Sequence, residues 1–130
     1  IKQARIEAEE LIGLTGLSSK RSVIAGQLGL VERKRLEIAR ALATKPELLL
    51  LDESMSGLNP AETEDAIRLI KEIRDSGITV MLVEHVMKVV IGMSDRIIVI
   101  NAGEKIAEGK PQEITGNKAV IAAYLGRRYA

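Results

Sequence analysis

Blocks of apolar residues, separated by polar and glycine-rich stretches, predict a chain in which helices and strands alternate. Residues 1–25 predict a helix and then a loop, because glycine and serine interrupt the apolar pattern from Gly13 onward. Residues 28–44 predict a second helix that ends before Pro46. The helical spacing of its apolar residues predicts a buried stripe of Leu36, Ala39, Leu42 and Ala43.

Two short apolar runs predict strands on either side of a third helix. The leucines at 48–51 are typical of a strand covered on both faces, although periodicity alone also allows a buried helix. A turn at 56–60 leads into the third helix, with Asn59 as its N-cap and Pro60 at its first position. The second run covers residues 78–83. This spacing predicts a βαβ unit, and therefore a parallel pair of strands. The predicted buried side of the third helix is Ile67, Ile70 and Ile73.

The rest of the chain predicts smaller elements. A short helix is expected at 86–93, and residues 96–101 and 105–108 predict a hairpin with its turn at Ala102 and Gly103. A helical turn is expected from Pro111 and a final short helix at 118–125.

Charged side chains follow both predicted parallel strands. Asp52 and Glu53 come after the first strand, and Glu84 and His85 come after the second. Because ligands bind beyond the carboxyl ends of parallel strands, we expect these side chains to meet at one edge of the sheet. Two simpler interpretations stay open: the acidic pair as a polar start to a loop, and the histidine as a solvated residue.

The predicted edge carries the groups that a phosphoryl-transfer site needs. An aspartate there can hold Mg²⁺, which prefers a few hard oxygen ligands together with substrate phosphates. A neighbouring glutamate can position or deprotonate a water, and a histidine can hydrogen-bond a terminal phosphate. The set Asp52, Glu53 and His85 therefore favours phosphoryl transfer.

The amino-acid composition argues against several classes of protein. With 19 basic and 18 acidic residues, the chain is not a polybasic nucleic-acid binder. Tyrosine is its only aromatic residue type and occurs twice, which disfavours base stacking, so we expect no nucleic-acid partner. The sequence has no cysteine, which excludes a disulfide framework and a thiolate metal site. No apolar run approaches the roughly 20 residues of a membrane span.

At these residues the sequence resembles the nucleotide-binding domain of ATP-binding cassette (ABC) proteins. Residues 35–43 resemble the helix after the family's signature motif, and residues 48–52 resemble its Walker B strand. The resemblance implies that Asp52 holds Mg²⁺, that Glu53 is the catalytic glutamate and that His85 is the switch histidine. It also implies a D-loop formed by Ser56, Gly57, Leu58 and Asn59, called the D-loop segment below.

The implied fold is α/β: a P-loop NTPase-like three-layer fold with a parallel sheet. We expect this chain to be the C-terminal part of it, with residues 1–27 as the end of the helical subdomain and residues 28–130 as the C-terminal part of the ATPase core. More narrowly, residues 84–87, 106–109 and 123–126 resemble the ATPase subunits of branched-chain amino acid importers.

The sequence departs from the family pattern in its lack of a Walker A motif. The nearest candidate, residues 103–111, has the wrong glycine spacing and a proline where serine or threonine belongs, and it lies on a predicted hairpin. The family's Walker A lies upstream of the region matched here, and the chain begins without methionine. We therefore expect a part of a longer domain that by itself binds ATP poorly.

The signature motif is also altered. The family's Leu-Ser-Gly-Gly-Gln aligns with Leu28, Gly29, Leu30, Val31 and Glu32, called the signature segment below. The serine hydroxyl and the second glycine are missing, and an acidic side chain replaces glutamine. In ABC dimers this segment completes the partner's site, so a weakened partner site is one outcome. A variant that works through backbone amides at the helix N-terminus is the other.

The resemblance implies an ATP-binding subunit that couples ATP hydrolysis to solute import, with branched-chain amino acids as the expected solute. ATP and Mg²⁺ are the expected cofactors, and a second ABC ATPase subunit and transmembrane permease subunits are the expected partners. The expected location is cytoplasmic, at the inner face of the cell membrane through the permease. Two alternatives stay open: an ABC fragment that dimerises without turnover, and a soluble ABC ATPase without a transport role.

Overall fold

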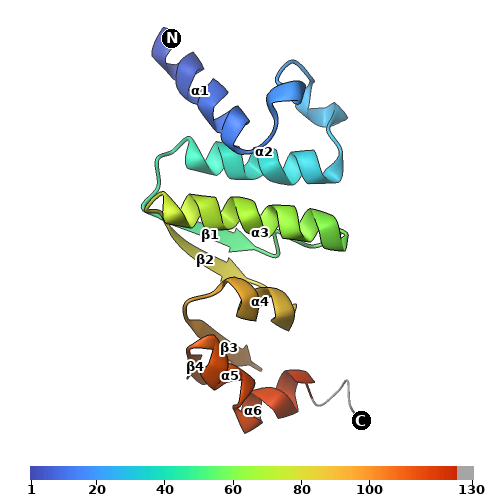
Figure 1. Cartoon of the computed structure of the whole chain (residues 1–130), viewed down its shortest axis with the longest axis vertical. Coiled ribbons are helices and arrows are strands. Elements are labelled where there is room, and N and C mark those ends of the chain that lie inside the picture. Colours follow the sequence, from blue (N-terminus) through green and yellow to red (C-terminus); the bar gives the residue numbers. More distant parts are fainter. Residues whose placement is uncertain (126–130) are drawn as a thin grey trace. The chain divides into compact units, whose positions relative to one another are not determined.

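The computed structural model describes residues 1–125 (Figure 1). The chain divides into two compact units, residues 1–83 and the residues from Glu84 onward, and each unit is described by itself. The division falls at the end of the second predicted strand. The boundary expected at residue 27 stays a prediction.

The first unit contains the predicted helices and strands in the predicted order. Helix α1 is followed by two short 3₁₀ turns, Ser18–Lys20 and Ala25–Gln27, in the segment that the sequence predicts as a loop. The regular elements are α1 (Lys2–Leu14), α2 (Leu30–Leu42), β1 (Leu48–Asp52), α3 (Pro60–Asp75) and β2 (Thr79–Val83).

Strands β1 and β2 are parallel neighbours, as predicted. Their register pairs Leu48 with Thr79 at one end and Asp52 with Val83 at the other. Helix α3, which connects them, packs against this sheet (Figure 1). The two strands therefore end at the same edge of the sheet.

The expectation that the leucine run is covered on both faces is wrong for this structure. Leu49 and Leu51 are buried, whereas Leu50 is 65% exposed and Met81, its partner on β2, is 54% exposed. Side chains along a strand point alternately to the two faces of the sheet. Within residues 1–83 only one face of the sheet is covered, so the alternate side chains remain exposed.

Helix α2 has a different buried stripe from the predicted one. Ala39 and Leu42 are buried as expected, but Leu36 is only partly buried and Ala43 is exposed. Ala43 lies beyond the last helical residue as the C-cap. Ile38, which the prediction left out, is buried because α2 contacts a neighbouring helix on more than one side.

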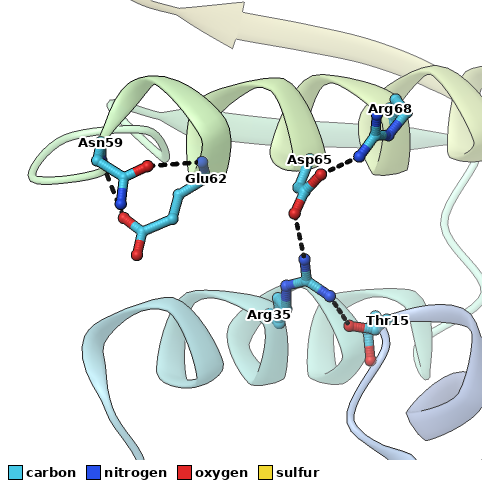
Figure 2. Close-up of polar contacts among 6 residues, drawn as sticks. All are labelled: Thr15, Arg35, Asn59, Glu62, Asp65 and Arg68. Atoms are coloured by element: carbon cyan, nitrogen blue, oxygen red, sulfur yellow. Dashed lines mark hydrogen bonds and ion pairs between the residues drawn. The ribbon is translucent and has the colours of Figure 1, made fainter.

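Helix α3 begins as predicted. The Asn59 side chain accepts a hydrogen bond from the Glu62 N–H at 2.9 Å, and the Glu62 carboxylate accepts one from the Asn59 N–H at 2.8 Å (Figure 2). These two bonds form a capping box, which satisfies amides that the first helical turn leaves without partners. Ile70 and Ile73 are buried and Ile67 is partly buried, close to the prediction.

The second unit also follows the prediction. Strands β3 and β4 form an antiparallel hairpin whose turn residues, Ala102 and Gly103, both have positive φ. The short final helix continues from α6 into a π-helical turn at Ile121–Leu125. The elements are α4 (Met87–Met93), β3 (Ile97–Asn101), β4 (Glu104–Gly109), α5 (Pro111–Thr115) and α6 (Lys118–Val120). The core of this unit consists of Ile97, Val99, Ile114 and Val120.

Helices and strands thus mix around a parallel sheet, which agrees with the expected α/β class. Among residues 1–125, no helix has both the length and the apolar character needed to cross a bilayer.

Candidate functional site

The acidic pair lies at the carboxyl edge of the β1–β2 sheet. Asp52 is the last residue of β1 and lies opposite Val83, the last residue of β2. The Glu53 N–H donates a hydrogen bond to the Val83 carbonyl at 2.9 Å, which extends the ladder by one residue. Both acidic residues are exposed. The predicted meeting of the two strand ends is confirmed.

Glu53 has an unusual backbone conformation. Its φ is +46°, in the left-handed region that residues with a Cβ seldom adopt. Two hydrogen bonds hold it there: its N–H donates to Val83, and its carbonyl accepts from the Ser56 N–H at 3.1 Å. Such conformations cost free energy and persist only where the surrounding structure holds them. They cluster at functional sites.

Glu84 and His85 directly follow Val83 in the sequence and open the second unit. Each has an interaction partner of its own. The approach of His85 to the acidic pair stays a prediction.

The signature segment and the D-loop segment lie against each other. Gly57 has a φ of +80°, and a Cβ at this position would lie 3.0 Å from Cδ2 of Leu30. That separation is shorter than a normal van der Waals contact, so glycine gives Leu30 the space that it occupies. The structure therefore brings together two segments that lie 24 or more positions apart in the chain.

The altered signature segment has its own internal hydrogen bonding. Leu28 is buried, and Gly29 is the N-cap of α2. The Glu32 carboxylate accepts a hydrogen bond from the Gly29 N–H at 2.7 Å and lies 3.1 Å from the Lys20 ammonium. The Gly29 hydrogen bond, followed by that from Lys20, lowers the pKa of Glu32 below its usual value. The negative charge of Glu32 is thus compensated within the chain.

The assignment of Mg²⁺ to Asp52 stays a prediction. Among residues 1–125, no three acidic or histidine side chains cluster as metal ligands. A single exposed carboxylate that leaves most positions to water and phosphate oxygens matches the preference of Mg²⁺.

Three features were missed by sequence reasoning. Lys20 pairs with Glu32 across 12 positions, and Arg35 pairs with Asp65 across 30. Ser54, beside Glu53, has a buried hydroxyl without a hydrogen-bond partner among the described residues. Helical periodicity does not report pairs at such separations, and Ser54 lies in a turn where no period applies.

Comparisons with known proteins agree with this arrangement. A family model described as ABC transporter matches residues 2–56, which include the signature segment, β1 and the acidic pair. A second model, described as branched-chain amino acid ATP-binding cassette transporter, matches residues 104–130. A curated relative described as an ATP-binding protein of a transporter is 48% identical over 90% of this chain. The chain therefore belongs to the ABC transporter ATP-binding family. The branched-chain model includes Gly126, which lies outside the described residues.

Relatives within the ABC family differ in the transport named for them. The high-affinity branched-chain amino acid transport ATP-binding protein LivG of Salmonella typhimurium is 48% identical over 118 residues, which cover 90% of this chain and 45% of LivG. The lipopolysaccharide export system ATP-binding protein LptB of Haemophilus influenzae is 34% identical, with 98% of this chain and 53% of LptB covered. The chain spans about half the length of these curated relatives.

A solved ABC structure has the same fold. The ADP conformation of an ATP-binding cassette superposes with a TM-score of 0.86 at 28% identity, covering 95% of this chain and 50% of that one. The expected P-loop NTPase-like class is thereby confirmed for the part of the ABC domain that this chain represents.

Proposed function

We propose that the whole protein is the ATP-binding subunit of an ABC transporter and couples ATP hydrolysis to solute import. The observation that carries the proposal is the edge of the sheet where β1 and β2 both end. Asp52 is the last residue of β1 there, and Glu53 follows it. Membership of the ABC family supports ATP and Mg²⁺ as the cofactors. A second ABC ATPase subunit and transmembrane permease subunits are the proposed partners, at the inner, cytoplasmic face of the membrane.

Three residues of this chain have separate roles in the proposed ATP hydrolysis. Asp52 would hold Mg²⁺, which supplies charge neutralisation for the phosphates when it is bound. Glu53 orients the attacking water and accepts its proton, because its carboxylate stands exposed just beyond the strand. His85 donates a hydrogen bond to the terminal phosphate.

The signature and D-loop segments belong to the same proposal. We assign Leu28, Gly29, Leu30, Val31 and Glu32, with Ser56, Gly57, Leu58 and Asn59, to the surface that meets the second subunit. The contact of Leu30 with Gly57 supports one continuous surface. The Glu32 carboxylate accepts the Gly29 N–H and pairs with Lys20, so donors to a phosphate would come from the other backbone amides of this segment.

Branched-chain amino acids are the proposed solute. The branched-chain family model at residues 104–130 and the 48% identity to LivG favour this class over the lipopolysaccharide named for LptB. Reconstitution of the whole protein with its permease should give ATP-dependent uptake of leucine, isoleucine or valine. Transport of lipopolysaccharide in their place would contradict this assignment.

The catalytic assignment is tested by Glu53→Gln in the whole protein. The substitution keeps the size of the side chain but removes the base, so ATP turnover should fall by about 10²- to 10⁴-fold. Glu64→Gln, on an exposed part of α3, is the matched control and should leave turnover unchanged. Turnover that survives Glu53→Gln would contradict the catalytic assignment. Absence of turnover in the unmodified whole protein would favour a second candidate, a subunit that dimerises without hydrolysis, for which the altered signature segment is the supporting observation.

A further inference from the structure

Arg35 connects three helices of the first unit. It lies on α2 with 26% of its side chain exposed. Its Nη1 donates a hydrogen bond at 3.2 Å to the carbonyl of Thr15, the C-cap residue of α1. Its Nη2 lies 4.0 Å from Oδ2 of Asp65 on α3 (Figure 2). One guanidinium thus reaches the end of α1 and the side of α3 together.

The backbone beside Thr15 is shaped to admit this guanidinium. Gly16 has a φ of +71°, and a Cβ at this position would overlap Nη1 of Arg35. Thr15 itself is fully buried, with its hydroxyl bonded to the Leu11 carbonyl at 2.8 Å. The acceptor that Arg35 meets is therefore held in a fixed place.

Asp65 has two basic partners, one on its own helix and one on α2. Arg68 pairs with it from one turn further along α3, and its side chain is 70% exposed (Figure 2). Arg35 reaches it from α2. The pair with Arg68 stays within α3, whereas the pair with Arg35 joins two helices. The chain thus contains a matched control for the interhelical contact.

A second contact joins α2 to the loop that precedes α3. Leu30, the first residue of α2, touches Gly57, three residues before α3 begins. Arg35 and Asp65 meet further along both helices. The ion pair holds α2 to α3 itself, and the Leu30 contact holds α2 to the loop before α3, so α2 meets this part of the chain at two separate points.

We propose that Arg35 is a positioning residue that holds the D-loop segment in register with the signature segment and with the end of α1. This inference rests on the proposed function, because the register matters for turnover only if both segments meet the same second subunit. Arg35 touches no substrate in this proposal and acts through α3.

A distance measurement tests the register without any need for ATP hydrolysis. Spin labels at Glu37→Cys on α2 and Glu72→Cys on α3 occupy exposed positions, and residues 1–130 contain no other cysteine. The distance distribution in the whole protein should broaden with Arg35→Ala and stay narrow with Arg68→Ala. Equal distributions in both variants would overturn the proposal.

Kinetics then separate positioning from a purely structural role. Arg35→Ala and Asp65→Asn should lower kcat of the whole protein about tenfold, with the KM for ATP changed less than twofold and the Hill coefficient lowered towards 1. Arg35→Lys should retain only part of kcat, because one ammonium lacks the planar fork that reaches both partners. Arg68→Ala should match the unmodified protein.

The remaining outcomes are decisive as well. A broadened distance with unchanged kcat and Hill coefficient would overturn the positioning role, as would a loss in Arg68→Ala equal to that in Arg35→Ala. If Arg35→Ala does not fold, Arg35→Lys carries both measurements. If the unmodified whole protein shows no ATP turnover, the proposed function fails, and the spin-label distances still decide whether Arg35 sets the register.

Discussion

At the scale of single residues, Ser54 stands out beside the candidate site. Its hydroxyl oxygen is buried and has no hydrogen-bond partner among the described residues. A buried hydroxyl that has left water without finding a partner costs about 1–3 kcal/mol. This destabilising hydroxyl lies next to Glu53, whose backbone is itself in a strained conformation.

Ser54→Ala should therefore raise the free energy of unfolding, by about 1 kcal/mol. Chemical denaturation at neutral pH measures the change. Ser22→Ala, at an exposed serine, is the control and should stay within about 0.5 kcal/mol of the unmodified protein. A loss of stability in Ser54→Ala would mean that the hydroxyl does have a partner.

Glu32 gives a pH-dependent prediction at the same scale. Its pKa is lowered in the fold, first by the Gly29 N–H and then by Lys20. Its contribution to stability is therefore complete above the unfolded value of about 4.3 and is lost as the pH falls through the lower folded pKa. The difference in denaturation midpoint between the unmodified protein and Glu32→Gln should shrink from pH 7 to pH 3. A difference that stays constant over this range would contradict the ionised contact.

At the scale of elements, local signals in the sequence predicted most of the fold. Asn59, Pro60 and Glu62 mark the start of α3 because capping depends on residues three positions apart. The strand ends were predictable because chain order and the right-handed crossover leave few topologies. Contacts between distant positions, such as Arg35 with Asp65, depend on packing that no local period encodes.

The cap of α3 can be tested by stability alone. Asn59→Ala removes the acceptor for the Glu62 N–H and should lower the free energy of unfolding by about 1 kcal/mol. Glu64→Ala, on an exposed part of the same helix, should change it by less than about 0.5 kcal/mol. Equal effects of the two changes would show that the capping bond adds nothing.

At the scale of the whole chain, one face of the β1–β2 sheet remains apolar and exposed. Leu50 and Met81 lie opposite each other in the register, and Leu48 and Val83 are about half exposed. Contiguous exposed apolar surface of this kind favours association. Sequence alone could not reveal this, because four leucines in a row look the same whether one face or both are covered.

The 130-residue chain expressed alone should therefore self-associate as its concentration rises. Leu50→Thr with Met81→Thr keeps residues that suit a strand and should reduce the association seen by sedimentation velocity. Leu49→Thr is the contrasting change: it lies in the core and should lower stability without removing the exposed face. Self-association that is unaffected by the paired change would place the contact elsewhere.

The close approach of Leu30 to Gly57 also bears on how this chain diverges over time. A mutation that adds a Cβ at position 57 costs less where position 30 has already become smaller, although the positive φ favours glycine on either background, so the order of mutations matters. Across related genes, the two codons should change in concert, even though they are 27 positions apart. The proposed subunit surface would thus evolve as a unit rather than as two independent motifs.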